Sequence, residues 1–197
     1  MKTLKLTRKD FKGTDSYWKE YVGKEDVSVY EGNIEIEGGL GYVRFASLKA
    51  TGFVLSGAGT GIEAGEGIEA GTGIEAGMGI EAGDGIEAGW GIEAGDGIEA
   101  GDGIKAGEGI KAGWGIEAGD GIEAGAGIVS GLEITCKLAL SSSLRIFAGV
   151  CWWRKIDEEE KTITCGKLES GVVAYGILKE IGMPVVAIDK ETGIATD

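Results

Sequence analysis

Isoleucine recurs at every sixth residue through the middle of the chain. From Gly61 to Gly127 the sequence repeats Gly-Ile-Glu-Ala-Gly-x without a break, and the isoleucine series runs from Ile62 to Ile128. A helix would rotate successive isoleucines by about 600°, so they would share no face. Glycine at this density would also destabilise a helix, by about 1 kcal/mol per residue relative to alanine. A short strand fits better, because alternation then places Ile and Ala on one side and Glu on the other.

Stacked copies of this hexad would bury the isoleucine and alanine ladders and expose the glutamates. The sequence therefore predicts an all-β fold, a β-solenoid, with corners formed by glycines at positive φ. Three hexads give a triangular, 18-residue coil, which we favour because three isoleucines and three alanines fill a narrow triangular core. Two hexads would give a flattened, 12-residue coil. The alternative to a solenoid is a disordered glycine-rich tract or a polyglycine-type bundle.

The six-residue spacing extends beyond the uniform repeat. Upstream, the apolar residues six apart are Ile36, Tyr42, Leu48 and Val54. Downstream, the isoleucine series continues through Ile134, Leu140, Ile146 and Trp152. These positions predict a solenoid over residues 31–152, with roughly six coils and a stack of about 30 Å at ~4.8 Å per coil.

Two shorter segments flank the predicted solenoid. Residues 1–30 contain a strand-like stretch, Thr3–Arg8, and several aromatic residues, so we expect a cap over one open end. Residues 153–197 predict an α/β cap at the other end. Its expected elements are a strand over Lys161–Cys165, an amphipathic helix over Leu168–Ile181 and a strand over Val185–Ile188.

The composition argues against an enzyme. The chain has no histidine, which removes the commonest general base and the commonest metal ligand. The cysteines Cys136, Cys151 and Cys165 form no C-x-x-C pair and are expected to be small core residues in a reducing compartment. No apolar stretch resembles a signal peptide or a membrane span. We therefore expect a non-enzymatic protein of the bacterial or phage-infected cytoplasm, with no cofactor, no metal and no membrane association.

The negative charge is concentrated in the repeat. The formal net charge is −14, and residues 61–127 carry 15 acidic residues against Lys105 and Lys111. In an 18-residue coil this predicts one column of Glu63, Glu81, Glu99 and Glu117, and a corner column of Glu66, Asp84, Asp102 and Asp120. Like charges about 4.8 Å apart repel and raise carboxylate pKa values, and folding does not require such columns.

Three uses of the acidic columns remain open from sequence. The first is imitation of nucleic acid, since the repeat carries about one net charge per 1.4 Å of stack against one per ~1.7 Å of duplex DNA. The partner would then be a basic nucleic-acid-binding protein, with no direct binding of nucleic acid by this chain. The second is cation binding, although the nine-residue pattern of calcium-binding solenoids is absent. The third is solubility alone.

Two tryptophans occupy the variable hexad position, which we expect at exposed corners. Trp90 and Trp114 are either binding residues or rings that lie flat over neighbouring glycines. They also test the coil length, because four hexads separate them. They would share a column in a 12-residue coil but not in an 18-residue coil.

The hexad ladder resembles two known groups of proteins. It is similar to hexapeptide-repeat acyltransferases, whose activity relies on a histidine that this chain lacks. The stretch Gly32–Gly38 and the Gly-Ile-x-Ala-Gly cadence also resemble bactofilins, which implies a triangular β-helix that polymerises through its ends. The first expectation is an inhibitor whose acidic face imitates nucleic acid, as phage or mobile-element proteins such as anti-CRISPRs do. The alternative is a bactofilin-like scaffold that forms a homo-oligomer through a solenoid end.

Overall fold

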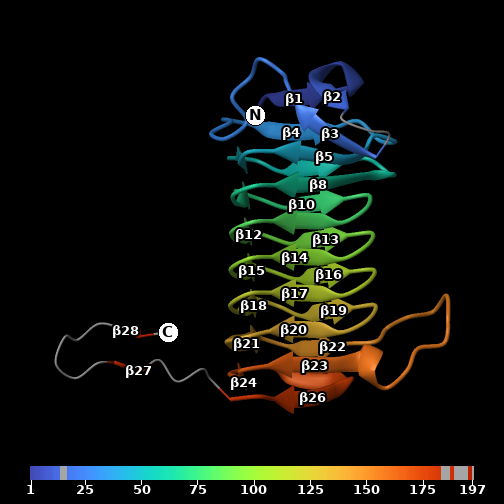
Figure 1. Ribbon diagram of the computed structural model, residues 1–197, viewed down its shortest axis with the longest axis vertical. Helices are drawn as coiled ribbons and strands as arrows, with labels where there is room; N and C mark the ends of the chain where they lie inside the picture. The colour runs from blue at the N-terminus through green and yellow to red at the C-terminus, as the bar shows by residue number, and fades with distance from the viewer. Residues whose placement is uncertain (14–16, 183–186, 189–194, 197) are drawn as a thin grey trace.

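Three parallel sheets form the walls of a β-solenoid (Figure 1). The computed structural model describes residues 1–13, 17–182, 187–188 and 195–196. Within the repeat, Ile74 pairs with Ile92 and Ile80 pairs with Ile98, so each coil consists of three hexads. The triangular coil is therefore confirmed, and the flattened coil of two hexads is excluded. The stack has about 8 turns rather than six, because strands near both ends extend it.

Within the repeat, each coil contributes one strand to each sheet. Sheet A contains β1 (Thr3–Leu6), β4 (Asn33–Ile36), β7 (Val54–Ser56), β10 (Ile74–Ala76), β13 (Ile92–Ala94), β16 (Ile110–Ala112), β19 (Ile128–Ser130), β22 (Arg145–Phe147) and β25 (Val172–Tyr175). Sheet B contains β2 (Phe11–Gly13), β3 (Trp18–Tyr21), β5 (Gly41–Phe45), β8 (Thr60–Ala64), β11 (Ile80–Ala82), β14 (Ile98–Ala100), β17 (Ile116–Ala118), β20 (Ile134–Cys136), β23 (Thr162–Cys165) and β26 (Ile177–Glu180). Sheet C contains β6 (Leu48–Ala50), β9 (Ile68–Ala70), β12 (Ile86–Ala88), β15 (Ile104–Ala106), β18 (Ile122–Ala124), β21 (Ala139–Ser142) and β24 (Lys167–Leu168).

One continuous apolar core runs through the stack. Isoleucines of the repeat, such as Ile80 and Ile98, are 1% exposed, and the alanines two positions later are also buried. Each isoleucine buried in this way contributes about 1.5–3 kcal/mol. Cys136 and Cys165 lie in the same core, as expected, whereas Cys151 is only partly buried.

The repeat glycines are needed for close approach between coils. No glycine between Gly61 and Gly127 has a positive φ, so the expectation of positive-φ corners is wrong for the repeat. A Cβ at Gly101, which follows alanine, would overlap the carbonyl oxygen of Gly83 in the neighbouring coil. A Cβ at Gly97, which precedes isoleucine, would lie 3.3 Å from the carbonyl oxygen of Gly115. The two glycines of one hexad are therefore not equivalent.

The N-terminal segment is built into the solenoid. β1 pairs with β4, which confirms the predicted strand near Thr3 and places it in sheet A. A 3-10 turn, η1 (Arg8–Asp10), leads to the antiparallel pair β2–β3 at the edge of sheet B. The buried Lys19 on β3 donates from Nζ to the carbonyl oxygen of Leu40.

The coils before the repeat contain more residues than three hexads. The apolar residues that face the core therefore differ from those predicted by the six-residue spacing. Ile34 pairs with Val54 and Val43 pairs with Ile62, and both pairs are more widely separated in sequence than Ile62 and Ile80 of the repeat. Ile36 therefore stands at the alanine position of its strand, opposite Ser56. Tyr42 pairs with Gly61 and lies outside the core ladder. The predicted ladder positions of Ile36 and Tyr42 are wrong because extra corner residues shift the register.

An inserted loop interrupts the downstream ladder. Trp152 is 88% exposed, so its predicted core position is wrong, and the ladder resumes at Ile163, which pairs with Ile134. The loop projects from the side of the stack between β22 and β23 and contains η2 (Glu159–Lys161) (Figure 1). Within it, Arg154 makes two contacts to the Glu160 carboxylate, which lower the pKa of Glu160 to about 2.

The predicted helix over Leu168–Ile181 is wrong. This segment forms β25 and β26, which add a last coil to sheets A and B. Gly171 and Gly176 adopt positive φ, 99° and 119°, and make its corners. In the described residues the C-terminal region contains strands and a 3-10 turn instead of an α/β cap. The predicted strand over Val185–Ile188 lies partly outside the described residues; Ala187–Ile188 is β27, which pairs with β28 (Ala195–Thr196).

We predict that alanine is tolerated at Gly97 and not at Gly101. Gly101→Ala should lower the free energy of unfolding by about 1–3 kcal/mol, as overpacking does. Gly97→Ala, in the same hexad, should change it by less than about 1 kcal/mol, because the neighbouring carbonyl needs to move only slightly. Urea unfolding monitored by circular dichroism measures both. Equal losses in the two variants would contradict the steric explanation.

Candidate functional site: an acidic strip on one face of the solenoid

The glutamates predicted to form one column do so on sheet B. Glu81 pairs in register with Glu63 on one side and Glu99 on the other, and Glu99 pairs with Glu117. Each of these glutamates lies between a buried isoleucine and a buried alanine, so alternation directs its side chain outward. We call Glu63, Glu81, Glu99 and Glu117 the glutamate column.

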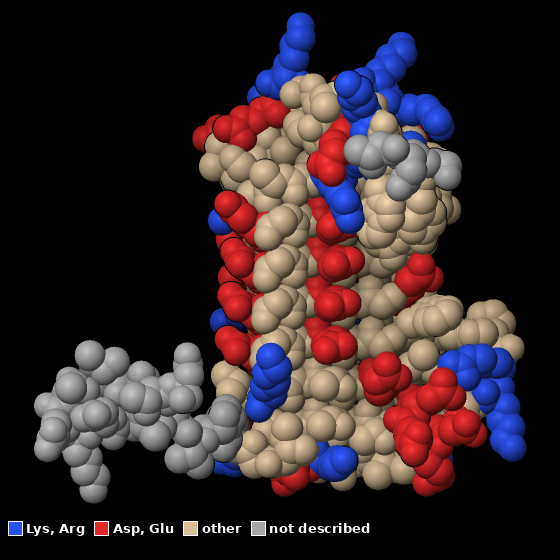
Figure 2. All heavy atoms as spheres, viewed as in Figure 1, with Lys and Arg blue, Asp and Glu red and all other residues tan. Residues whose placement is uncertain are grey.

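The predicted corner column is also present, between sheets B and C. Its backbone hydrogen bonds connect consecutive members: Asp84 N donates to Glu66 O at 3.4 Å, Asp102 N to Asp84 O at 3.2 Å, and Asp120 N to Asp102 O at 3.0 Å. Each member follows its glutamate-column partner by three positions. The glutamate column and this corner column (Glu66, Asp84, Asp102 and Asp120) together form the acidic strip. Figure 2 shows acidic side chains in two parallel columns along the stack.

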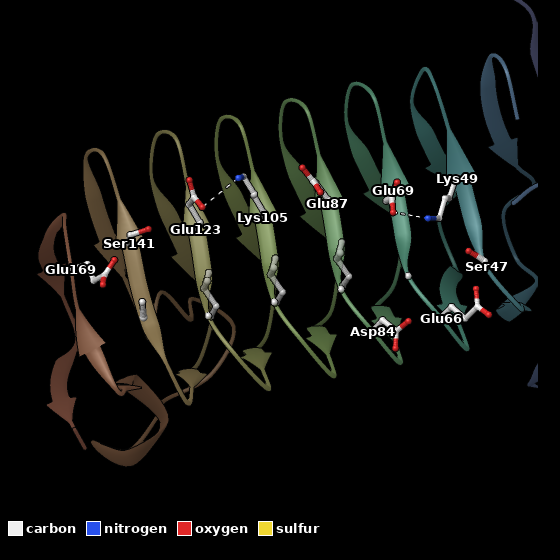
Figure 3. Close-up of a pocket in the computed structure, with 18 residues that line it drawn as sticks. Ser47, Lys49, Glu66, Glu69, Asp84, Glu87, Lys105, Glu123, Ser141 and Glu169 are labelled. Atoms are coloured by element: carbon white, nitrogen blue, oxygen red, sulfur yellow. Dashed lines mark hydrogen bonds and ion pairs between the residues drawn. The ribbon is translucent and has the colours of Figure 1, made fainter. Parts of the chain in front are cut away.

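The lysines of the repeat fall on the other two sheets. Lys111 on sheet A lies 2.5 Å from Glu93, and Lys105 on sheet C lies 3.6 Å from Glu123. Sheet C carries a further pair, Lys49 with Glu69 at 2.7 Å (Figure 3). Sheets A and C therefore each carry lysine–glutamate pairs, although Glu75 on sheet A and Glu87 on sheet C have no ion pair among the described residues.

The acidic strip contains no basic residue. Among the described residues its one ion pair is at the N-terminal end, where Arg44 Nε lies 2.8 Å from the Glu63 carboxylate. Figure 3 shows Glu66 and Asp84 following one another along the corner beside sheet C. The strip is thus a continuous row of carboxylates next to two faces whose glutamate columns are interrupted by a lysine.

The electrostatic environment of the strip raises the pKa of Glu81. Partial burial is the main cause, and the like charges of Glu63 and Glu99 add to it, while Arg44 acts in the opposite direction. Tyr42, on β5 of sheet B, has a raised pKa because of burial and the nearby Asp96 carboxylate. Neighbouring carboxylates therefore add to the effect of burial in raising the pKa values of Glu81 and Tyr42 on sheet B.

The two tryptophans lie on different corners, as the three-hexad coil predicts. Trp114 is 51% exposed on the corner between sheets A and B, where its backbone N–H donates to Asp96 O. Trp90 is 61% exposed on the corner between sheets C and A, where its backbone N–H donates to Thr72 O. The structure brings Trp114 to the edge of the sheet that carries the glutamate column, and it places Trp90 away from the strip.

Sequence reasoning missed the residues at the N-terminal end of the glutamate column. Tyr42 packs 4.9 Å from Trp18, centroid to centroid, and Arg44 lies over the Trp18 ring at 4.1 Å. Trp18 pairs with Tyr42, which pairs with Gly61, so all three positions belong to sheet B. Only the alternation within Gly41–Phe45 could have indicated an outward Tyr42 and Arg44.

The described residues contain no cluster of candidate metal ligands. No group of three or more Cys, Asp and Glu side chains in this part of the chain is placed to hold a metal ion. Burial raises the pKa of Cys136 to about 12, so its thiol is a packing group rather than a nucleophile. Among the described residues, no helix is long and apolar enough to span a membrane.

Comparison with protein families, with curated proteins and with solved structures found no match in any of the three.

We predict that mild acidification stabilises the solenoid through Glu81. A carboxyl whose pKa is raised by folding binds more protons folded than unfolded, so stability falls as pH rises through the folded pKa and increases on acidification toward 4.5. Glu81→Gln should therefore be more stable than the wild type at pH 7 and should lose part of this pH dependence. Glu75→Gln on sheet A is the control for the amide substitution.

Thermal unfolding between pH 7 and pH 4.5 measures the effect. An identical pH dependence in the wild type and Glu81→Gln would contradict the prediction.

Proposed function

We propose that the protein is a non-enzymatic binding protein whose acidic strip imitates the phosphates of a nucleic acid and occupies a basic groove of a DNA- or RNA-binding protein. The observation that supports this most is the placement of eight acidic residues and no basic residue on one face of a rigid stack. A defence nuclease whose groove accepts nucleic acid is one such target.

The charge spacing of the strip suits this role. The strip presents two carboxylates per coil, and coils repeat at about 4.8 Å, so one charge falls every ~2.4 Å of stack. Duplex DNA carries one per ~1.7 Å and a single strand one per ~3.4 Å. A groove lined with lysine and arginine for either nucleic acid would meet a comparable density of negative charge.

The distribution of lysine favours a binding role over solubility alone. A solubilising surface needs charge but no particular arrangement of it. In this repeat the two lysines interrupt the glutamate columns on sheets A and C, whereas the strip on sheet B and its corner contains no lysine. The strip is therefore set apart from the other faces.

A second candidate function is a self-assembling scaffold similar to bactofilins. It is favoured by the C-terminal end of the stack, where β25 and β26 are the last strands of their sheets and Val172, Ile177 and Ile181 are exposed. Edge strands with exposed apolar side chains are surfaces on which another chain can add.

We predict that neutralising the strip abolishes partner capture. The strip variant carries Glu81→Gln, Asp84→Asn, Glu99→Gln and Asp102→Asn. The control variant carries the same change in net charge on other faces, Glu75→Gln, Glu87→Gln, Glu93→Gln and Glu108→Gln. The immobilised wild type should capture nucleic-acid-binding proteins from a bacterial lysate and release them to duplex DNA or high salt. The strip variant should capture at least tenfold less, and the control about as much as the wild type. Equal capture by both variants, or no displacement by DNA, would reject the proposal.

The scaffold candidate makes a separate prediction. The wild type should form end-to-end assemblies that grow with concentration, and Ile177→Lys with Ile181→Lys should reduce them, because charge at an edge blocks strand addition. Val22→Lys, at an exposed apolar residue near the other end of the chain, is the control. Light scattering after size exclusion and electron microscopy measure the assemblies. A strict monomer at all concentrations would rule the scaffold out.

A further inference from the structure

The glutamate column already holds one guanidinium group. Arg44 donates from Nε to Glu63 at 2.8 Å, and its guanidinium carbon lies 4.1 Å from the centroid of the Trp18 ring. Arg44 and Glu63 are register partners, so Arg44 stands next to the column in the stack. The chain thus pairs a planar cation with both a carboxylate and an aromatic face, an arrangement that favours arginine over lysine.

The following coils place carboxylates and two aromatic rings along the same sheet, without an arginine. A groove runs along sheet B, and the aromatic residues that line it are Tyr42 and Trp114. Its floor includes Gly79, Gly97 and Gly115, which have no side chains to fill it. Its acidic side chains include Glu81, Glu99, Glu117 and Asp96. We call this hollow the sheet-B groove.

The aromatic rings of the sheet-B groove are held in place. Tyr42 packs against Trp18 and Tyr17, with ring centroids 4.9 Å and 5.5 Å apart. Trp114 is fixed through its backbone between Asp96 and Leu132 of the same corner, and half of its side chain remains exposed. The half-exposed Trp114 ring and the partly buried Tyr42 ring, beside carboxylates, offer the two kinds of contact that Arg44 makes with Trp18 and Glu63.

We propose that the sheet-B groove binds arginine side chains of the protein partner, with a guanidinium against the Trp114 or Tyr42 ring and paired with carboxylates of the glutamate column. This inference rests on the proposed function and deepens it: the partner's basic groove is lined by arginine in preference to lysine. An ammonium group carries the same charge, but it is compact and strongly hydrated and lacks a planar face to lie on the ring.

Trp90 provides a matched comparison within the repeat. It is 61% exposed against 51% for Trp114, but its corner neighbours are Thr72 and Glu108. The columns on the sheets beside it, A and C, each contain a lysine that pairs with a glutamate. An arginine near Trp90 would meet Glu87 and Glu108, which have no ion pair among the described residues, but each neighbouring glutamate column is interrupted by a lysine.

The test uses two fluorescently labelled peptides, hexa-arginine and hexa-lysine, and the full chain. Anisotropy titrations at low and moderate salt give the affinity of each peptide for the wild type, Trp114→Ala, Trp90→Ala and Glu99→Gln. We expect the wild type to bind hexa-arginine more tightly than hexa-lysine. Trp114→Ala should weaken hexa-arginine binding about two- to fivefold, the range of exposed cation–π contacts, and leave hexa-lysine nearly unchanged. Trp90→Ala should affect neither peptide.

Two outcomes would overturn the inference. One is equal affinity for the two peptides, and the other is equal effects of Trp114→Ala and Trp90→Ala. If the peptides bind equally but Glu99→Gln weakens both, the arginine preference fails and the acidic strip remains a general polyanion. If Glu99→Gln also has no effect, the proposed function loses its support as well. Circular dichroism melting of each variant establishes that the fold is retained.

Discussion

Vertical register between coils is the constraint on which this structure depends. Isoleucine must lie on isoleucine from one three-hexad coil to the next, and glycine must follow alanine so that a carbonyl oxygen of the neighbouring coil has room. Because the buried side chains are held in this register, the outward-facing side chains of the same strands are held in it as well. A glutamate placed between Ile and Ala necessarily becomes one member of a column. The acidic strip is thus a direct consequence of core packing, and its geometry is as regular as the core.

The core supplies enough free energy to tolerate the strip. Two hydrated carboxylates about 4.8 Å apart repel by about 1 kcal/mol, so two columns cost about 2 kcal/mol per coil. Each coil of the repeat buries three isoleucines at about 1.5–3 kcal/mol each, before the alanines are counted. The solenoid can therefore carry a face of largely unpaired carboxylates. Burial is the main cause of the raised pKa of Glu81, and the like charges of Glu63 and Glu99 add to it. Sheets A and C reduce the repulsion between glutamates by placing Lys111 and Lys105 in their columns.

The uniform repeat could be predicted from sequence because every hexad repeats the same choice of residues. The three-hexad coil is favoured because three isoleucines and three alanines fill a triangular core. For that coil, both acidic columns and the separate corners of Trp90 and Trp114 follow from counting. The ends could not be predicted in the same way. Extra residues at the corners place Ile34 and Val43 in the core. No local sequence signal gives the number of these extra residues. The segment after Leu168 has apolar residues three and four apart, which imitate a helix, but this spacing arises from two strands joined at Gly176.

The irregular coil length also prevented the prediction of the residues at the N-terminal end of the glutamate column. Arg44 and Tyr42 lie in an irregular coil, so their place above the glutamate column appears only once the register is known. That place matters, because it shows the column in contact with a cation of the chain itself. Arg44 meets Glu63 and Trp18 together, which is a more selective arrangement than charge alone. A polyanion that served only solubility would need no aromatic residues along its carboxylates. Tyr42 on sheet B and Trp114 on the neighbouring corner lie along glutamates that have no basic partner among the described residues, and this combination supports the proposed recognition of a partner.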